Sequence, residues 1–218
     1  MNGERLHTLT NPLINENAIT AQILGLCIAL AVTKTLATAL IMSAAVIAVL
    51  VLSSSAVSLI RNYIPRSIRL IVQLTIIASL VIVVDQVLRA YAFEMSRLLS
   101  VYVGLIVTNC LIFARVETFA MNNRVTLSAL DALGNGLGYG IILITIGSVR
   151  ELLGTGQLLG RTVLLTTAEG GWFQPFTLML MPPSAFFLIG LLIWGIRTVK
   201  TAQVEPKEFA VAQPGEAR

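Results

Sequence analysis

Six apolar segments, two of them short, divide this chain and restrict its fold more than any other feature. The hydrocarbon core of a bilayer is ~30 Å thick, so a helix that crosses it needs about 20 mostly apolar residues. The segments fall at about 18–32, 36–60, 68–88, 98–113, 130–149 and 178–196. The pattern predicts an all-α integral membrane protein with six transmembrane helices.

Composition supports the same class and excludes others. Hydrophobic residues make up 56% of the chain and charged residues only 12%, whereas a soluble domain carries about 25% charged residues. The formal net charge is +4, but the basic residues stand singly or in pairs at the ends of apolar segments. That spacing orients a protein in the lipid bilayer and does not form the basic face that nucleic acid requires.

The polar residues define the ends of the predicted membrane domain. Residues 1–17 form a polar N-terminal segment without a signal-peptide pattern, 18–200 form the six-helix domain, and 201–218 form a polar C-terminal tail. Six spans place both termini on one side, and that side carries the larger share of Lys and Arg. The positive-inside rule therefore predicts cytoplasmic termini.

The first and fourth segments are short for full spans, because Lys34 closes one and Arg115 closes the other. Short apolar segments in corresponding places of two halves indicate broken helices that meet near the bilayer midplane. We therefore predict two halves of three helices each, at about 18–92 and 98–198. An odd number of helices per half makes the second half inverted in the membrane.

A glycine-rich stretch at 134–140 resembles a phosphate-binding loop at first sight. Tyr139 occupies the place of the third glycine of a dinucleotide motif, and the stretch opens a predicted membrane helix instead of following a strand. Small residues at this spacing are typical of helices that pack closely in a membrane. We predict helix packing and not nucleotide binding.

Cys27 and Cys110, the two cysteines, both lie inside apolar segments. Free cysteines often serve as small buried hydrophobes, and a disulfide needs Cα atoms within about 7 Å. A third interpretation is metal ligation, but two thiolates supply only half of the four ligands of an iron–sulfur cluster. His7 is the only histidine, which argues against a haem or zinc site built by this chain alone.

Three acidic residues lie close to the predicted membrane helices. Asp85 is near the end of the third segment, Asp131 begins the fifth, and Glu151 ends it beside Arg150. Carboxylates within a membrane are costly and often mark an ion pathway, so Asp85 and Asp131 are candidates for a cation path. Asp85 also has Arg89 four residues on, a spacing that favours an ordinary ion pair on a helix surface.

Several specific runs of sequence resemble a known family. The resemblance covers about residues 17–200, and its motifs are at 24–27, 29–33, 58–62, 77–86, 106–110, 134–140 and 183–190. These runs are similar to the D subunits of sodium-translocating NADH:ubiquinone reductases. The homologous membrane subunits of Rnf complexes, which link ferredoxin and NAD, share the cysteine motifs; residues 84–86 and 134–140 favour the sodium-pump branch.

The resemblance implies a specific role for the cysteines. Cys27 and Cys110 match the two family positions that ligate an intramembrane [2Fe–2S] cluster, shared with a homologous sister subunit of opposite orientation. The chain would relay electrons across a bacterial inner membrane as part of a six-subunit, sodium-pumping complex. The resemblance places FMN, FAD, riboflavin, NADH and ubiquinone on other subunits.

Two other classes remain open from the residues alone. A small secondary cation transporter would alternate access around Asp85 between its inverted halves. A purely structural scaffold would show no transport. Both tolerate replacement of Cys27 and Cys110 by serine, whereas a protein that ligates a cluster does not.

Overall fold

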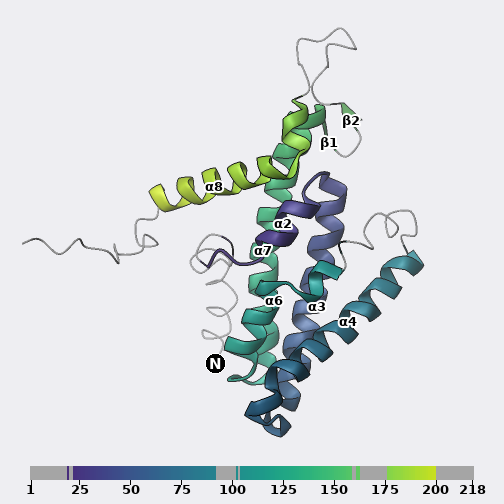
Figure 1. The fold of residues 1–218 in the computed structure, drawn as a ribbon, viewed down its shortest axis with the longest axis vertical. Helices are drawn as coiled ribbons and strands as arrows, with labels where there is room; N and C mark the ends of the chain where they lie inside the picture. The colour runs from purple at the N-terminus through teal and green to yellow at the C-terminus, as the bar shows by residue number, and fades with distance from the viewer. Residues whose placement is uncertain are drawn as a thin grey trace, which may run out of the picture.

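The computed structural model describes residues 19, 22–91, 102, 104–158, 161–162 and 176–199. The predicted polar segment 1–17, the tail 201–218 and the predicted side of the termini lie outside these residues. The described chain is almost entirely helical (Figure 1). A short hairpin of β1 (Gln157–Leu158) and β2 (Arg161–Thr162) is antiparallel, with Gln157 paired to Thr162.

Two long helices, α3 (Leu36–Ile60) and α7 (Val125–Thr155), lie side by side and form the centre of the molecule (Figure 1). Glycines on α7 permit the close approach. A Cβ on Gly136 would lie 2.9 Å from Ile47 Cγ1, and one on Gly140 would lie 3.3 Å from Ser43 Cβ. The predicted helix packing by the glycine-rich stretch is therefore confirmed.

Helix α4 (Arg69–Tyr91) packs against α3, and helix α8 (Pro182–Val199) contacts α2, η5 and α7; the two helices lie on opposite sides of the central pair (Figure 1). Two 3₁₀ turns, η1 (Arg61–Tyr63) and η2 (Arg66–Ile68), connect α3 to α4, and η5 (Thr177–Leu180) precedes α8. Both outer helices expose large apolar side chains, as helices in contact with lipid do: Ile71, Ile82, Val83, Phe186, Phe187 and Trp194.

Three helical stretches among the described residues are long and apolar enough to cross a membrane: Leu36–Tyr63, Arg69–Ala90 and Val125–Thr155. Helix α8 contains a shorter apolar stretch, Pro182–Thr198. The second and third predicted segments agree closely with α3 and α4. The prediction that 130–149 is the fifth helix was too short, and the glycine-rich stretch lies inside α7, because α7 begins at Val125.

The first and fourth predicted segments contain only short helices where the structure describes them. Helix α2 (Leu26–Val32) has seven residues, and α6 (Cys110–Arg115) has six before it continues as the π-helix η3 (Val116–Ala120). Residues 104–107 are helical, but a break at 108–109 separates them from α6. Seven residues of α-helix extend only about 10 Å, so α2 by itself does not cross a bilayer.

Candidate functional site

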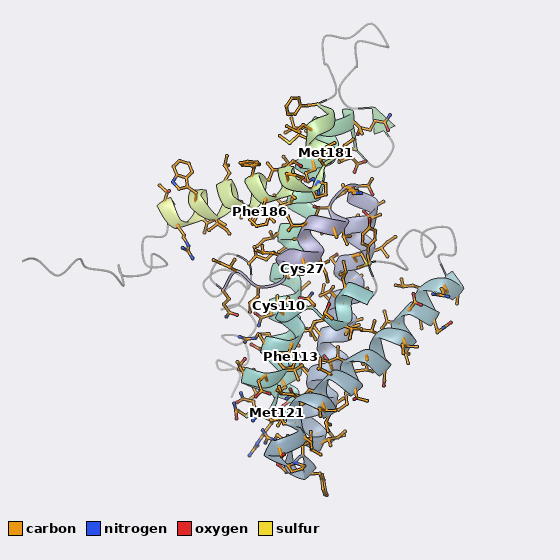
Figure 2. All side chains as sticks on the ribbon, viewed as in Figure 1. Cys27, Cys110, Phe113, Met121, Met181 and Phe186 are labelled. Carbon is orange, nitrogen blue, oxygen red and sulfur yellow. The ribbon has the colours of Figure 1, made fainter. Side chains whose placement is uncertain are left out.

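The two cysteines lie at the beginnings of the two short helices. Cys27 is the second residue of α2, and Cys110 is the first residue of α6. The N–H of Gly25, just before α2, donates to Sγ of Cys110 at 2.9 Å. The structure thus brings Cys27 and Cys110 close together, although no local sequence motif connects them (Figure 2). Both cysteines are free; Cys110 is half-buried, and Cys27 is exposed on this chain.

Gly25 takes a backbone conformation that few other residues adopt. Its φ is +79° and its ψ is 13°, in the left-handed region. A Cβ at this position would lie 2.6 Å from Cε2 of Tyr139. Glycine is therefore required twice, by the torsion angle and by the contact with the ring. This conformation directs the Gly25 N–H at the Cys110 sulfur.

Tyr139 of α7 is fully buried beside this turn. Its hydroxyl donates to the carbonyl oxygen of Gly25 at 2.7 Å. A buried phenol normally finds a hydrogen-bond partner, and here that partner is Gly25 in the turn before α2.

Asn109 shapes the start of α6. Its backbone is extended, and its Oδ1 accepts from the Leu111 N–H at 2.9 Å, which is an ordinary N-cap. Its Nδ2 is buried and faces the Tyr139 hydroxyl, but it makes no hydrogen bond of normal geometry to any described residue. Asn109 therefore lies beside Tyr139 at the start of α6.

Helix α7 holds α6 through an ion pair. Arg115, the last residue of α6, makes a two-pronged contact with Asp131, including Nε to Oδ2 at 3.0 Å. Their side chains are only 13% and 4% exposed. Asn135 adds a hydrogen bond from Nδ2 to the backbone oxygen of Asp131 at 3.0 Å. Asp131, which the sequence placed at a helix start, is thus buried and paired within α7.

Helix α7 also holds the far end of α2. The fully buried guanidinium of Arg150 donates to Thr33 Oγ1 at 2.7 Å, next to the end of α2. Its other donors bind backbone carbonyls at the end of η5, and these are the oxygens of Met179, Leu180 and Met181. Glu151 accepts the first N–H of α3, from Leu36, at 2.6 Å. Arg150 and Glu151, which are adjacent at the predicted end of the fifth segment, therefore hold α2, η5 and α3 in place.

The second candidate for a cation path, Asp85, lies apart from this site. It pairs with Arg89 at 2.9 Å on α4, and the Arg89 side chain is 51% exposed. The ion pair expected from the spacing of these residues is therefore confirmed. The structure does not bring Asp85 together with Asp131, which is bound to α6 through Arg115.

A second polar cluster was missed by the sequence reasoning. Arg69 at the start of α4 pairs with Glu117 of η3 at 2.6 Å, and Gln73 donates to the same carboxylate at 2.7 Å. The three residues join α4 to the π-helix that follows α6. Opposite charges at the start of the third apolar segment and just after the fourth were the available signal, but their sequence separation gives no reason to pair them.

The arrangement at the cysteines suits a soft metal ion or an iron–sulfur cluster, because thiolates prefer such partners. Among the described residues, no group of three or more His, Cys, Asp or Glu side chains could hold a metal ion. The two thiols, one of which accepts from the Gly25 N–H, could supply two of the ligands of such a site. The chemistry of the donors fits a [2Fe–2S] cluster if two further thiolates come from outside this chain.

Comparison with known proteins gives a consistent match. The family model described as "Rnf-Nqr subunit, membrane protein" matches residues 5–193. The chain is 59% identical over 197 residues to the D subunit of the Na(+)-translocating NADH-quinone reductase of Yersinia enterocolitica, covering 90% of this chain and 94% of that protein. The corresponding protein of Psychromonas ingrahamii, of the same name, is 58% identical over 200 residues, covering 92% and 95%. That of Shewanella putrefaciens is 57% identical over 204 residues, covering 94% and 97%.

Proposed function

This chain belongs to the Rnf-Nqr family of membrane subunits, and on that premise we propose that it is a subunit of a sodium-translocating NADH:quinone reductase. In this proposal Cys27 and Cys110 supply two of the four thiolate ligands of an intramembrane [2Fe–2S] cluster. The observation that carries the proposal is the Gly25 N–H at 2.9 Å from Cys110 Sγ. This contact joins the two helix starts that present the cysteines.

Two kinds of donor support a cluster at this point. A cluster with four thiolates is negatively charged, and burial of such a charge is costly unless hydrogen bonds compensate it. Gly25 already donates to a cysteine sulfur, and the buried Asn109 amide belongs to the residue that immediately precedes Cys110. When bound, the cluster would accept one electron and pass it on, and these donors would stabilise the added charge.

A sister subunit supplies the other half of the site in this proposal. Cys27 is exposed on this chain, and the described residues offer no further group of metal ligands near it. A homologous chain of opposite orientation would bring an equivalent pair of cysteines. Its approach would bury Cys27 and complete the ligand set.

The order of elements supports two inverted halves. A short cysteine-bearing helix, a long central helix and an outer helix follow one another twice, as α2, α3, α4 and as α6, α7, α8. We propose that the first and fourth predicted segments, at about 18–32 and 98–113, also cross the membrane, which makes six spans. The bilayer core is ~30 Å thick, so a site between the two short helices would divide electron transfer into two shorter steps.

The remaining parts of the reaction lie elsewhere in this proposal. NADH, FMN, FAD, riboflavin and ubiquinone would bind to other subunits of a six-subunit complex in a bacterial inner membrane. Both termini of this chain would be cytoplasmic. Asp85 and Asp131 remain proposed positions on a cation path, although each has an arginine partner in the structure.

Activity of the purified complex tests the electron-relay role. Cys27→Ser and Cys110→Ser should each abolish NADH-driven quinone reduction. NADH oxidation by an artificial acceptor at the flavin end should persist, because those steps precede the cluster. Ser53→Ala is a matched control, since Ser53 is a buried residue of α3 whose hydroxyl bonds only to its own helix in the described structure. Normal quinone reduction in both serine variants would favour a transporter or a scaffold instead.

A further inference from the structure

Tyr139 stands out because it is a polar side chain at the centre of a membrane helix. It is fully buried within α7. Phenylalanine would fill the same space without the cost of burying a hydroxyl. The cost is offset by one specific contact, since the hydroxyl donates to the Gly25 carbonyl at 2.7 Å. The position of this contact points to a role at the cysteine site.

The contact restrains the one residue whose N–H touches a cysteine sulfur in the described part of the chain. Gly25 at φ +79° directs its N–H to Cys110 Sγ and its carbonyl to Tyr139. Glycine is the residue with the most backbone freedom. A hydrogen bond to its carbonyl and a ring packed against its α-carbon restrict that freedom. Tyr139 thereby controls the direction of the Gly25 N–H, although its own hydroxyl donates to the Gly25 carbonyl and not to the sulfur.

We propose that Tyr139 is a positioning residue that raises the reduction potential of the cluster at Cys110 by holding Gly25 in its sulfur-binding conformation. This inference rests on the proposed cluster. A hydrogen bond to a ligand sulfur stabilises the more negative, reduced state, so it makes the potential less negative. In a buried site such a bond has a larger electrostatic effect than in water.

Helix α2 provides a control that separates the positioning of the Gly25 N–H from the general attachment of α2 to α7. Thr33 at the other end of α2 is also tied to α7, through the bond from Arg150 at 2.7 Å. Thr33→Val removes that bond and leaves the Tyr139–Gly25–Cys110 contacts in place. If Tyr139 only held α2 against α7, the two variants should act alike on the cluster.

The test is a redox titration of the intact complex, followed by EPR, with iron measured in each sample. Tyr139→Phe keeps the ring, so it should assemble with its full iron content. Its [2Fe–2S] midpoint potential should shift to a more negative value, whereas Thr33→Val should leave the potential at the wild-type value.

Three results would overturn the inference. The first is an unchanged potential in Tyr139→Phe, and the second is an equal shift in both variants. The third is loss of iron from Tyr139→Phe, which would assign the hydroxyl to assembly of the site instead. Absence of the cluster from the wild-type complex would contradict the proposed function itself, so the two failures are distinguishable.

Discussion

Helices α2 and α6 both begin at a cysteine-bearing turn, but different residues shape the backbone before each. The turn before α2 depends on Gly25 in the left-handed region, with no side-chain cap. The turn before α6 depends on Asn109, whose own side chain caps the helix. Gly25 thus needs a partner from elsewhere, Tyr139, whereas Asn109 supplies its hydrogen bond locally.

The attachments to α7 differ in the same way. Helix α6 is fixed by a buried ion pair between Arg115 and Asp131. Helix α2 is fixed by uncharged acceptors at both ends, the Gly25 carbonyl and the Thr33 hydroxyl. The comparison teaches that α7 serves as a common support, with a charge pair on the Cys110 side and a backbone contact on the Cys27 side.

Breaking the ion pair should have the largest effect on stability. Asp131→Asn leaves Arg115 buried without its counter-charge, and removing one partner of a buried pair costs about 3–5 kcal/mol. The purified complex should therefore lose this chain at a clearly lower temperature in a thermal scan. The double variant Arg115→Met with Asp131→Leu leaves no charge unpaired and should regain most of the loss. Equal losses in the single and double variants would show that the pair does not hold α6.

A side chain at Gly25 should have the next largest effect. Gly25→Ala places a Cβ 2.6 Å from the Tyr139 ring and imposes a left-handed conformation on alanine, which alone costs about 1–2 kcal/mol. The thermal midpoint should fall. Gly190→Ala is the control, because a Cβ there would have no described atom within 4 Å. Similar midpoints for both variants would contradict the strained turn before α2.

Removing the cap of α6 should cost less. Asn109→Ala deletes the bond to the Leu111 N–H at 2.9 Å, and loss of an N-cap costs about 1 kcal/mol. Asn109→Asp keeps the cap oxygen and should retain the stability of the wild type better than alanine does. If Gly25→Ala proves milder than Asn109→Ala in the same thermal scan, the contrast between the two turns is wrong.

The smallest effect on stability is expected at Asp85, which is 15% exposed but whose partner Arg89 is 51% exposed, because a pair with one exposed member contributes less than a fully buried pair. Asp85→Asn should leave the thermal midpoint almost unchanged. If Asp85 lies on the cation path, the variant should also require more sodium for half-maximal turnover. Unchanged sodium stimulation in steady-state assays would remove Asp85 from that path.

The membrane class and the long helices followed from periodicity and length, because apolar runs of about 20 residues have few other uses. The short helices at Cys27 and Cys110 also had a signal, since charged residues close both segments early. Helix ends were harder to predict. The start of α7 at Val125 and that of α8 at Pro182 depend on turns that hydropathy does not register.

The contacts between residues of the candidate site could not be predicted from the sequence. Gly25 and Cys110 are 85 positions apart, and Tyr139 is 114 positions from Gly25. Their contacts arise only when α2 and α6 pack on α7. In the sequence, Tyr139 is visible only as an interruption of a glycine motif. By contrast, the N-cap of Asn109 and the ion pair of Asp85 with Arg89 involve neighbours in sequence, and rules based on spacing can anticipate such contacts.

Iron content and low-temperature EPR of the purified complex test the central claim most directly. Cys27→Ala and Cys110→Ala should each remove about two irons per complex and the same single [2Fe–2S] signal, while Ser53→Ala should retain both. Unchanged iron and an unchanged signal in either cysteine variant would contradict a cluster held between the two helix starts.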